Sequence, residues 1–120
     1  MNGQKYDTNK IRMDLLPFEA LEAVAEVLTF GAKKYADNGW QKVENADARY
    51  RAAMLRHFCA DQKGEKRDPE SGLLHAAHLA TNALFILWFE LQKEKVNDPM
   101  LERLRKEFRN ISEVNNGLPK

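Results

Sequence analysis

Residues 68–93, DPESGLLHAAHLATNALFILWFELQK, decide the fold of this chain. Nearly every side of the helix predicted from Glu70 to about Lys93 is apolar, so neighbouring elements must bury it on all flanks. Asp68 is placed to cap this helix, with Pro69 at its first position and an acid in its first turn. A long buried helix at the centre of a small domain indicates an all-α fold.

The rest of the chain predicts three more helices and no strand. Apolar residues recur every three or four positions in each of them. Their expected ranges are Phe18–Ala36, Ala48–Lys63 and Asp98 to about Asn110. Three helices of this size can hardly cover the central one, so we expect a bundle of about four helices completed as a homo-oligomer, a dimer or larger.

Length and composition indicate one domain. The 120 residues are enough for a single core, and we expect a polar N-terminal arm over 1–14, a helical domain over 15–110 and a frayed C-terminal tail over 111–120. The net charge of +1 gives no general attraction to duplex DNA or to a membrane. The apolar segment 73–91 contains two His, an Asn and a Thr, which favours a buried helix over a membrane span.

The single cysteine and the absence of a signal peptide fit the cytoplasm. Dinucleotide-binding, P-loop, zinc-protease and serine-hydrolase motifs are all missing from the sequence.

Three polar residues on one stripe of the apolar central helix are the sharpest anomaly. His75, His78 and Asn82 follow one another at spacings of three and four. Burying them costs free energy unless each finds a partner. Two histidines at this spacing can share a metal ion or donate hydrogen bonds to a phosphate. A satisfied core histidine is the alternative for either one alone.

The first helix carries a row of acids, Glu19, Glu22 and Glu26. A solvated face with acids near the helix N-terminus explains such a row. Alternatively, carboxylates in line bind Mg²⁺ or Mn²⁺, which prefer oxygen ligands.

Other side chains suit phosphate and base recognition. Lys33, Lys34 and Arg56 are candidate phosphate partners, although solvated surface charge is the usual fate of a lysine. His57 has Asp61 four residues on, where the carboxylate could orient its imidazole. Tyr35 and Trp40 flank a turn, where they could stack on a base or close the end of the core.

These residues also carry a family resemblance. The matching strings are DLLPFEALEAVAEVLTFGAKKY (14–35), Asn38-x-Trp40, Arg56-His57, Gly64-Glu65 and DPESGLLHAAHLATNALF (68–85). They resemble the small domain named for the N-terminal part of dATP/dGTP diphosphohydrolases, which occurs widely in phages and prophages. The resemblance covers about residues 5–92.

That domain is similar in outline to the all-α MazG-type nucleoside triphosphate pyrophosphohydrolases, in which ExxE and ExxD motifs hold Mg²⁺. The resemblance implies a MazG-like helical bundle that hydrolyses purine deoxynucleotides such as dATP or dGTP to monophosphate and pyrophosphate. Glu19-x-x-Glu22 matches the first motif, but His75-x-x-His78 stands where ExxD is expected. Two imidazoles in place of two carboxylates favour Mn²⁺, Co²⁺ or Zn²⁺ over Mg²⁺.

The resulting hypothesis assigns a role to each candidate residue. The metal ligands would come from Glu19, Glu22, Glu26, His75 and His78, and the catalytic groups would be Glu22, His57 and His78. The substrate-binding residues would be Lys33, Lys34, Tyr35, Asn38, Trp40, Arg56 and Asn82. The alternatives are a nucleotide-binding phage protein that sequesters a signal without hydrolysis, and a structural or accessory oligomer.

Overall fold

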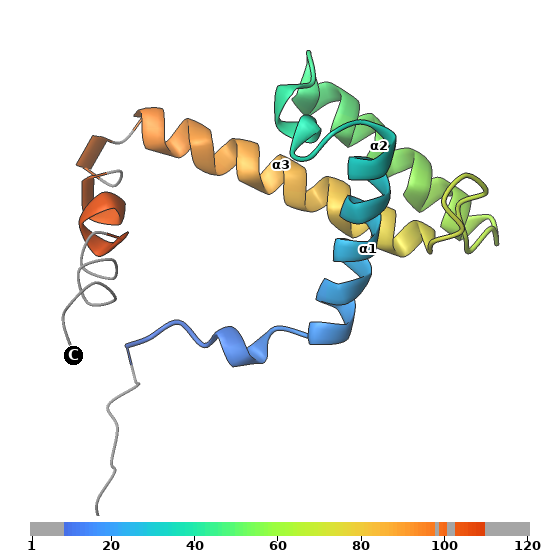
Figure 1. Ribbon diagram of the computed structural model, residues 1–120, viewed down its shortest axis with the longest axis horizontal. Helices are drawn as coiled ribbons and strands as arrows, with labels where there is room; N and C mark the ends of the chain where they lie inside the picture. Colours follow the sequence, from blue (N-terminus) through green and yellow to red (C-terminus); the bar gives the residue numbers. More distant parts are fainter. Residues whose placement is uncertain (1–8, 98, 101–102, 110–120) are drawn as a thin grey trace, which may run out of the picture.

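The computed structural model describes residues 9–97, 99–100 and 103–109 (Figure 1). Three main helices lie in this part of the chain: α1, Phe18–Lys34; α2, Ala46–Gln62; and α3, His75–Asn97. Two short 3-10 helices, η1 (Met13–Leu15) and η2 (Gly39–Lys42), accompany them, and residues 103–109 are also helical. Extended pairing in the described residues is confined to one isolated bridge between Arg67 and Leu74. The prediction of an all-α fold is confirmed.

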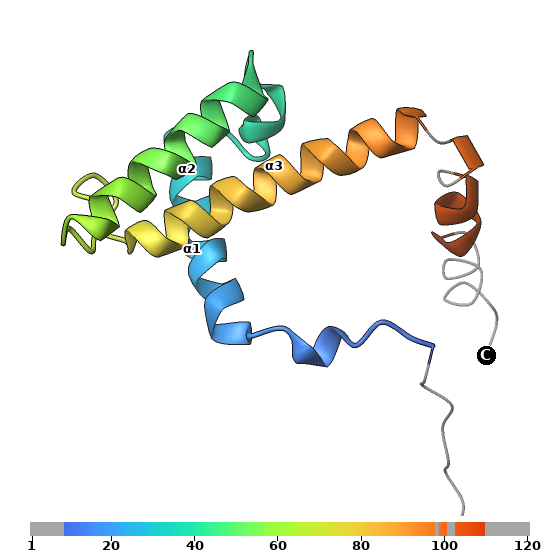
Figure 2. The ribbon, with the colours of Figure 1, turned by 180° about the vertical axis from the view of Figure 1, so that it is seen from behind.

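Helices α2 and α3 pack side by side, and α1 crosses them (Figures 1 and 2). Residues 9–17 lead away from this crossing and are exposed throughout. The helical segment 103–109 lies beyond the C-terminal end of α3. The site-bearing part of the molecule is therefore the α2–α3 pair with the C-terminal half of α1.

The start of α1 is as expected and its end differs slightly. Pro17 precedes the first helical residue, because a proline needs no hydrogen bond in the first turn. The helix ends at Lys34, two residues before the predicted Ala36, since the backbone of Tyr35 leaves the helical region. Helix α2 spans Ala46–Gln62 against a predicted 48–63.

The predicted start of α3 at Glu70 is wrong, because the helix begins at His75. The capping role of Asp68 is real but serves a single turn: its Oδ2 accepts a hydrogen bond from the Ser71 N–H at 2.9 Å. Gly72 then adopts φ +75, in the left-handed region, which breaks the helical path. Leu74 pairs back to Arg67, and only after this loop does the chain resume a helix.

The predicted last helix agrees with helical residues 99–100 and 103–109. Asp98 and the tail from Asn110 lie outside the described residues. In the part of the chain that is described, no helix is both long and apolar enough to cross a membrane.

An aromatic cluster ties the chain after α1 to the other two helices. The Trp40 ring stacks on Phe85 with centroids 4.4 Å apart and meets Trp88 and Phe89 edge-on. Tyr50 of α2 packs on Phe85 and donates a 2.6 Å hydrogen bond to the carbonyl oxygen of Trp40. The turn before η2 reverses the chain through Asn38, whose φ of 56 lies in the left-handed region that Asn tolerates.

Full burial of apolar side chains is scarce in this chain. Among the described residues only Val27 and Ala77 are buried apolar residues, whereas His75, His78, Thr81 and Asn82 are buried polar ones. The expectation that neighbours cover α3 on all flanks is not met within one chain, since Leu84 and Leu87 stay about half exposed. The best-buried part of the molecule is thus a polar cluster at the start of α3.

Candidate functional site

The polar cluster forms where α2 ends, the loop 63–74 turns back and α3 begins. Gly64, with φ +99, lets the chain leave α2 sharply, and Gly72 returns it toward α3. The loop is fastened by backbone hydrogen bonds from the Asp68 N–H to Leu73 and from the His75 N–H to Lys66, both at 2.8 Å. This fastening brings loop side chains against the first turn of α3.

Two histidines from different helices meet in the cluster. Nδ1 of His57, on α2, lies 2.8 Å from Nδ1 of His75, on α3. The other ring nitrogen of His75, Nε2, donates to Oε1 of Glu65 at 2.7 Å. Because that bond places the proton of a neutral His75 on Nε2, its Nδ1 carries a lone pair directed at His57.

A third histidine completes the cluster from one turn further along α3. The ring of His78 stacks on that of His57, with centroids 4.5 Å apart and an angle of 10° between the ring planes. Its Nε2 shares a hydrogen bond with Oγ of Ser71 at 2.7 Å and lies 3.9 Å from Oδ2 of Asp68. Asn82 donates from Nδ2 to the carbonyl oxygen of His78 at 2.8 Å.

The environment favours neutral histidines and an ionised aspartate. Burial, reinforced by the neighbouring histidines, lowers the pKa of His57, and burial also lowers the pKa of His78. Burial alone would raise the pKa of the Asp68 carboxyl. The hydrogen bonds from Ser71 and the nearby imidazoles outweigh it, so the pKa of Asp68 lies below its usual value.

Three of these side chains converge closely enough to hold a metal ion. One ligand atom from each of His57, Asp68 and His75 lies within 4.8 Å of the other two. No other group of three His, Cys, Asp or Glu side chains in the described residues does so. The predicted ligand His75 belongs to this group, and the predicted ligand His78 lies beside it.

A cavity of about 1130 Å³ opens beside the cluster, between α1, the turn to η2, α2 and α3. Its volume is slightly above the range of about 300–1,000 Å³ that is usual for small-molecule sites. Eight of the predicted residues line it: Lys34, Tyr35, Asn38, Trp40, Arg56, His57, His78 and Asn82. Lys33 does not line the cavity, although its neighbour does.

The chain matches a known protein family. The family described as "dATP/dGTP diphosphohydrolase, N-terminal" matches residues 1–99. The chain belongs to this family. A relative from Salmonella phage PMBT28, named "dATP/dGTP diphosphohydrolase", is 39% identical over 90 residues. This match covers 73% of the chain but 30% of the relative, so the chain spans less than a third of that protein's length. No solved structure matches the chain.

In this member of the dATP/dGTP diphosphohydrolase N-terminal family, the acidic row lies apart from the histidines. Glu19, Glu22 and Glu26 are exposed on α1, do not line the cavity and take no part in the group that converges within 4.8 Å. Within a single chain, the structure therefore does not bring the predicted carboxylate and histidine ligands together. The C-terminal half of α1, rather than its acidic N-terminal half, borders the cavity.

Two aromatic candidates and one lysine have other contacts. One face of the Trp40 ring stacks on Phe85, so Trp40 contributes to the aromatic core. It also borders the cavity. Tyr35 is 75% exposed at the cavity edge, with the Lys34 ammonium 5.2 Å from its ring centroid. Lys34 also forms an ion pair with Glu70 of the loop, which ties α1 to the loop before α3.

Sequence reasoning missed the loop's contribution to the cluster. Asp68 was interpreted as a cap alone, and Glu65 and Ser71 were given no role. Asp61, the predicted partner of His57, pairs with Lys66 at 3.1 Å instead. The two glycines that flank residues 65–71 were the available signal, since a tight loop between two helices carries its side chains back onto their ends.

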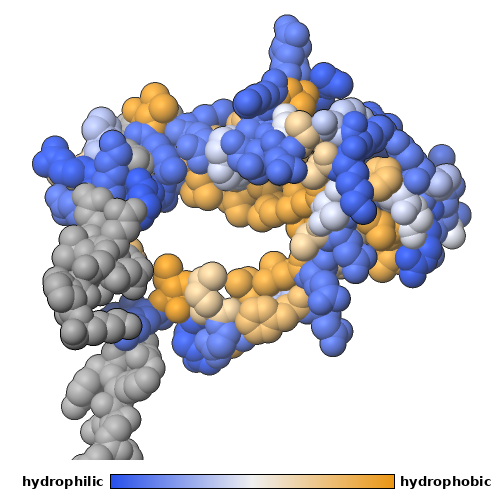
Figure 3. Space-filling view, in the orientation of Figure 1, coloured by the Kyte–Doolittle hydropathy of each residue, from blue (hydrophilic) through white to orange (hydrophobic). Residues whose placement is uncertain are grey.

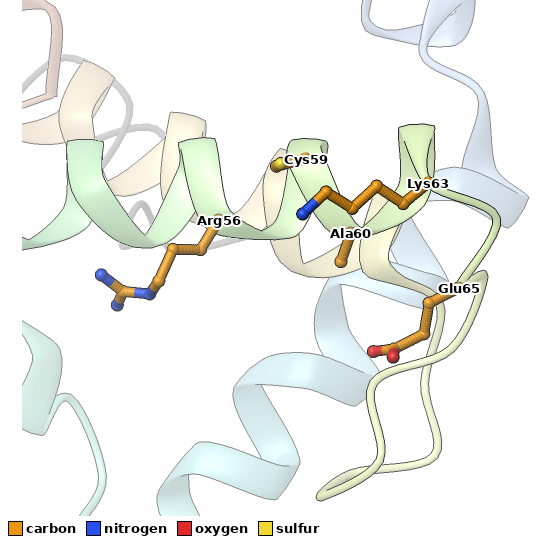
Figure 4. A pocket seen from close by; sticks show the side chains of 5 residues that line it. All are labelled: Arg56, Cys59, Ala60, Lys63 and Glu65. Carbon is orange, nitrogen blue, oxygen red and sulfur yellow. The ribbon is translucent and has the colours of Figure 1, made fainter.

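A second, smaller cavity of about 340 Å³ lies where α2 meets the loop 63–74 (Figure 4). Arg56, Cys59, Ala60, Lys63 and Glu65 line it. Figure 4 shows Arg56 and Glu65 on the same side of the α2 ribbon, with the thiol of Cys59 on the other. Arg56 lines both cavities.

Proposed function

We propose that this chain hydrolyses purine deoxynucleoside triphosphates, dATP or dGTP, to the monophosphate and pyrophosphate in the 1130 Å³ cavity. The observation that carries the proposal is the composition of its wall: basic residues Lys34 and Arg56 and histidines His57 and His78 border one space. Membership of the dATP/dGTP diphosphohydrolase N-terminal family and the name of the phage relative supply the substrate class.

The basic side chains suit the triphosphate. Arg56 can grip phosphate oxygens with two parallel hydrogen bonds, and Lys34 adds a point charge. Both would neutralise charge that develops when the bond between the α-phosphorus and the bridging oxygen breaks. Tyr35 and Asn38 also line the cavity and are left for the nucleoside.

The histidines suit water activation and metal binding. Because burial lowers the pKa of His78, this side chain stays neutral near pH 7 and can accept a proton from the attacking water. The imidazole and carboxylate donors of His57, Asp68 and His75, of which His57 lines the cavity, fit a divalent ion such as Mn²⁺, Co²⁺ or Zn²⁺. When bound, such an ion supplies positive charge for the phosphates and lowers the pKa of a coordinated water.

A product assay tests the proposal. Each dNTP is incubated with the purified protein and Mg²⁺, Mn²⁺, Co²⁺ or Zn²⁺, and nucleoside monophosphate and pyrophosphate are separated by chromatography. We expect turnover of dATP or dGTP, and a loss of kcat/KM of tenfold or more in Arg56→Ala, which removes charged hydrogen bonds worth about 1.5–3 kcal/mol each. Lys34→Ala should also impair hydrolysis, whereas the matched control Lys33→Ala should not, because only Lys34 lines the cavity.

The assay also separates the alternatives. Absence of turnover with every metal ion, together with a nucleotide-dependent rise in melting temperature, would make the chain a nucleotide-binding protein that does not hydrolyse its ligand. Absence of both effects would contradict nucleotide hydrolysis and nucleotide binding alike, and would favour a structural or accessory oligomer.

A further inference from the structure

We infer that His57, Asp68 and His75 form a binding site for one divalent transition-metal ion, with Glu65 as the positioning residue for His75. The inference starts from their ligand atoms, all within 4.8 Å of one another. The predicted set of Glu19, Glu22, Glu26, His75 and His78 shares only one residue with it. The site deepens the proposed function by naming a cofactor site, but metal binding is measurable without substrate.

The orientation of His75 supports the site. The Glu65 carboxylate accepts the Nε2 proton at 2.7 Å, which fixes the ring and leaves Nδ1 free of a proton. Metal-binding histidines commonly donate their other ring nitrogen to a carboxylate in this way, which raises ligand basicity. Because His75 is only 4% exposed, its ring cannot swing out to another partner without disrupting the start of α3.

The distance between the two histidines supports it as well. The Nδ1 atoms lie 2.8 Å apart, so a metal-free protein needs a proton between them. Two ligand nitrogens about 2.1 Å from one tetrahedral ion lie about 3.4 Å apart, so the two rings need to separate by only about 0.6 Å to share an ion. Transfer of that one proton from Nδ1 to Nε2 of His57 would leave two lone pairs directed at a common point and both rings neutral.

The negative charge of the cluster also favours a bound cation. The Asp68 side chain is 17% exposed, and among the described residues no lysine or arginine forms an ion pair with it. With neutral imidazoles, the cluster and the adjoining Glu65 carboxylate carry two negative charges. A divalent cation balances both, and a set of two nitrogens and one oxygen selects Zn²⁺, Co²⁺ or Mn²⁺ over Mg²⁺.

A metal titration without nucleotide tests this site. Untagged protein is stripped with a chelator, and binding of Co²⁺ and Zn²⁺ is followed by calorimetry and by the visible absorption of bound Co²⁺. We expect one ion per chain, much weaker binding of Mg²⁺, and a loss of affinity of 100-fold or more in Asp68→Asn, which is nearly isosteric. His57→Asn is the second variant, and circular dichroism verifies that both are folded.

Glu22→Gln is the matched control, because Glu22 is a predicted ligand that lies on exposed α1. Unchanged Co²⁺ affinity in folded Asp68→Asn, absence of any bound ion, or loss of binding in Glu22→Gln would each overturn the inference. The hydrolysis assay is independent: metal binding without turnover leaves the site standing and contradicts only the proposed function.

A separate observation leads to a second proposal. Figure 3 shows apolar surface on both sides of an opening between residues 9–21 and the α2–α3 pair. On one side the large exposed apolar residues are Ile11, Met13, Leu15, Leu16, Phe18 and Leu21, and on the side of α3 they are Leu84 and Leu87. Each is between 40% and 87% exposed. We propose that a second copy of this chain fills the opening.

The area of these two surfaces suits a dimer. At this degree of exposure, the eight side chains together present about 400 Å² of apolar surface to solvent. A standard interface buries about 800 Å² on each partner, and about two thirds of a homodimer interface is apolar. Each copy offers both surfaces, so a two-fold arrangement can pair them reciprocally, and a net charge of +1 opposes this only weakly.

The oligomeric state in solution tests the second proposal. We expect twice the chain mass of 13.8 kDa by light scattering after gel filtration, and a shift to one chain mass in Leu15→Lys and in Leu87→Lys. Leu55→Lys is the control, because Leu55 is 61% exposed on α2, outside both surfaces. A wild-type monomer at about 100 μM, well above the micromolar Kd of the weakest interfaces of standard size, would overturn the proposal. The proposal would also be overturned if Leu55→Lys dissociated the dimer and Leu15→Lys and Leu87→Lys did not.

Discussion

The Nε2 atom of His75 donates a hydrogen bond to Oε1 of Glu65 at 2.7 Å, across the junction between the loop and α3. Glu65 is 53% exposed at its side chain and His75 is 5% exposed, so the pair joins the surface to the polar cluster. The effect of this pair is to fix which nitrogen of His75 faces His57.

Glu65→Gln should weaken Co²⁺ or Zn²⁺ binding by about 10- to 100-fold, the usual effect of losing such a carboxylate partner. The amide can still accept the Nε2 proton through its oxygen, but it no longer adds negative charge. Dissociation constants from calorimetric titration provide the measurement. Glu70→Gln is the control, since Glu70 lies on the same loop but pairs with Lys34. An equal loss in both variants would mean that the loop as a whole, rather than Glu65, matters.

Gly72→Ala should destabilise the protein by more than 1 kcal/mol, at about the level expected when Ala is forced to a positive φ. Gly72 has φ +75, and a Cβ there meets no atom within 4 Å, so backbone strain rather than a clash is the cause. Gly31→Ala should have the opposite sign and stabilise α1 by about 0.5–1 kcal/mol, because Gly31 is helical with open space around it. Urea unfolding measures both. Two substitutions with the same sign would contradict the backbone argument.

Tyr50→Phe should lower the free energy of unfolding by about 1 kcal/mol, the usual net value of one hydrogen bond. It removes the 2.6 Å bond from Tyr50 Oη to the Trp40 carbonyl but keeps the ring against Phe85. Tyr35→Phe, at a side chain that is 75% exposed, should leave stability unchanged. Thermal unfolding of the two variants is the comparison, and equal melting temperatures would show that the Trp40 carbonyl is satisfied in another way.

Metal-free protein should lose stability as the pH falls below about 6.5. Burial and the neighbouring histidines lower the pKa of His57 in the folded state, and burial lowers that of His78, so the unfolded chain binds more protons in this window. The free energy of unfolding then falls with decreasing pH by at most about 1.4 kcal/mol per pH unit for each group. The loss stops once the folded histidines are protonated too. No such penalty exists above pH 6.5, where both states are neutral.

Urea unfolding in the presence of a chelator between pH 8 and pH 5.5 measures this dependence. His78→Gln should flatten the curve, because one of the two contributing imidazoles is gone. A curve with the same slope in this variant would assign the pH dependence to other groups.

The sequence by itself determined the helices and the importance of the His75–His78–Asn82 line. Periodicity placed α1 and α2 within about two residues of their observed ends, because the spacing of apolar side chains reports directly on a 3.6-residue repeat. The polar stripe on α3 was identified by its cost of burial, and these three residues are indeed buried. Lys34, Tyr35, Asn38 and Trp40, around the turn after α1, line one cavity, because residues so close in sequence stay close in space.

Only the tertiary structure decided which side chains meet. Asp68 satisfies a local capping pattern, and nothing local shows that one left-handed glycine would end that turn and direct the loop onto His57. Conversely, Glu19, Glu22 and Glu26 share a helix face, but face-sharing does not fix how that helix crosses α3, and the acids lie away from the histidines. Helix periodicity is a property of neighbours in sequence. The meeting of His57, Asp68 and His75 depends on the path of the loop between two helices, and that path is set by backbone hydrogen bonds within the loop and to the first residue of α3.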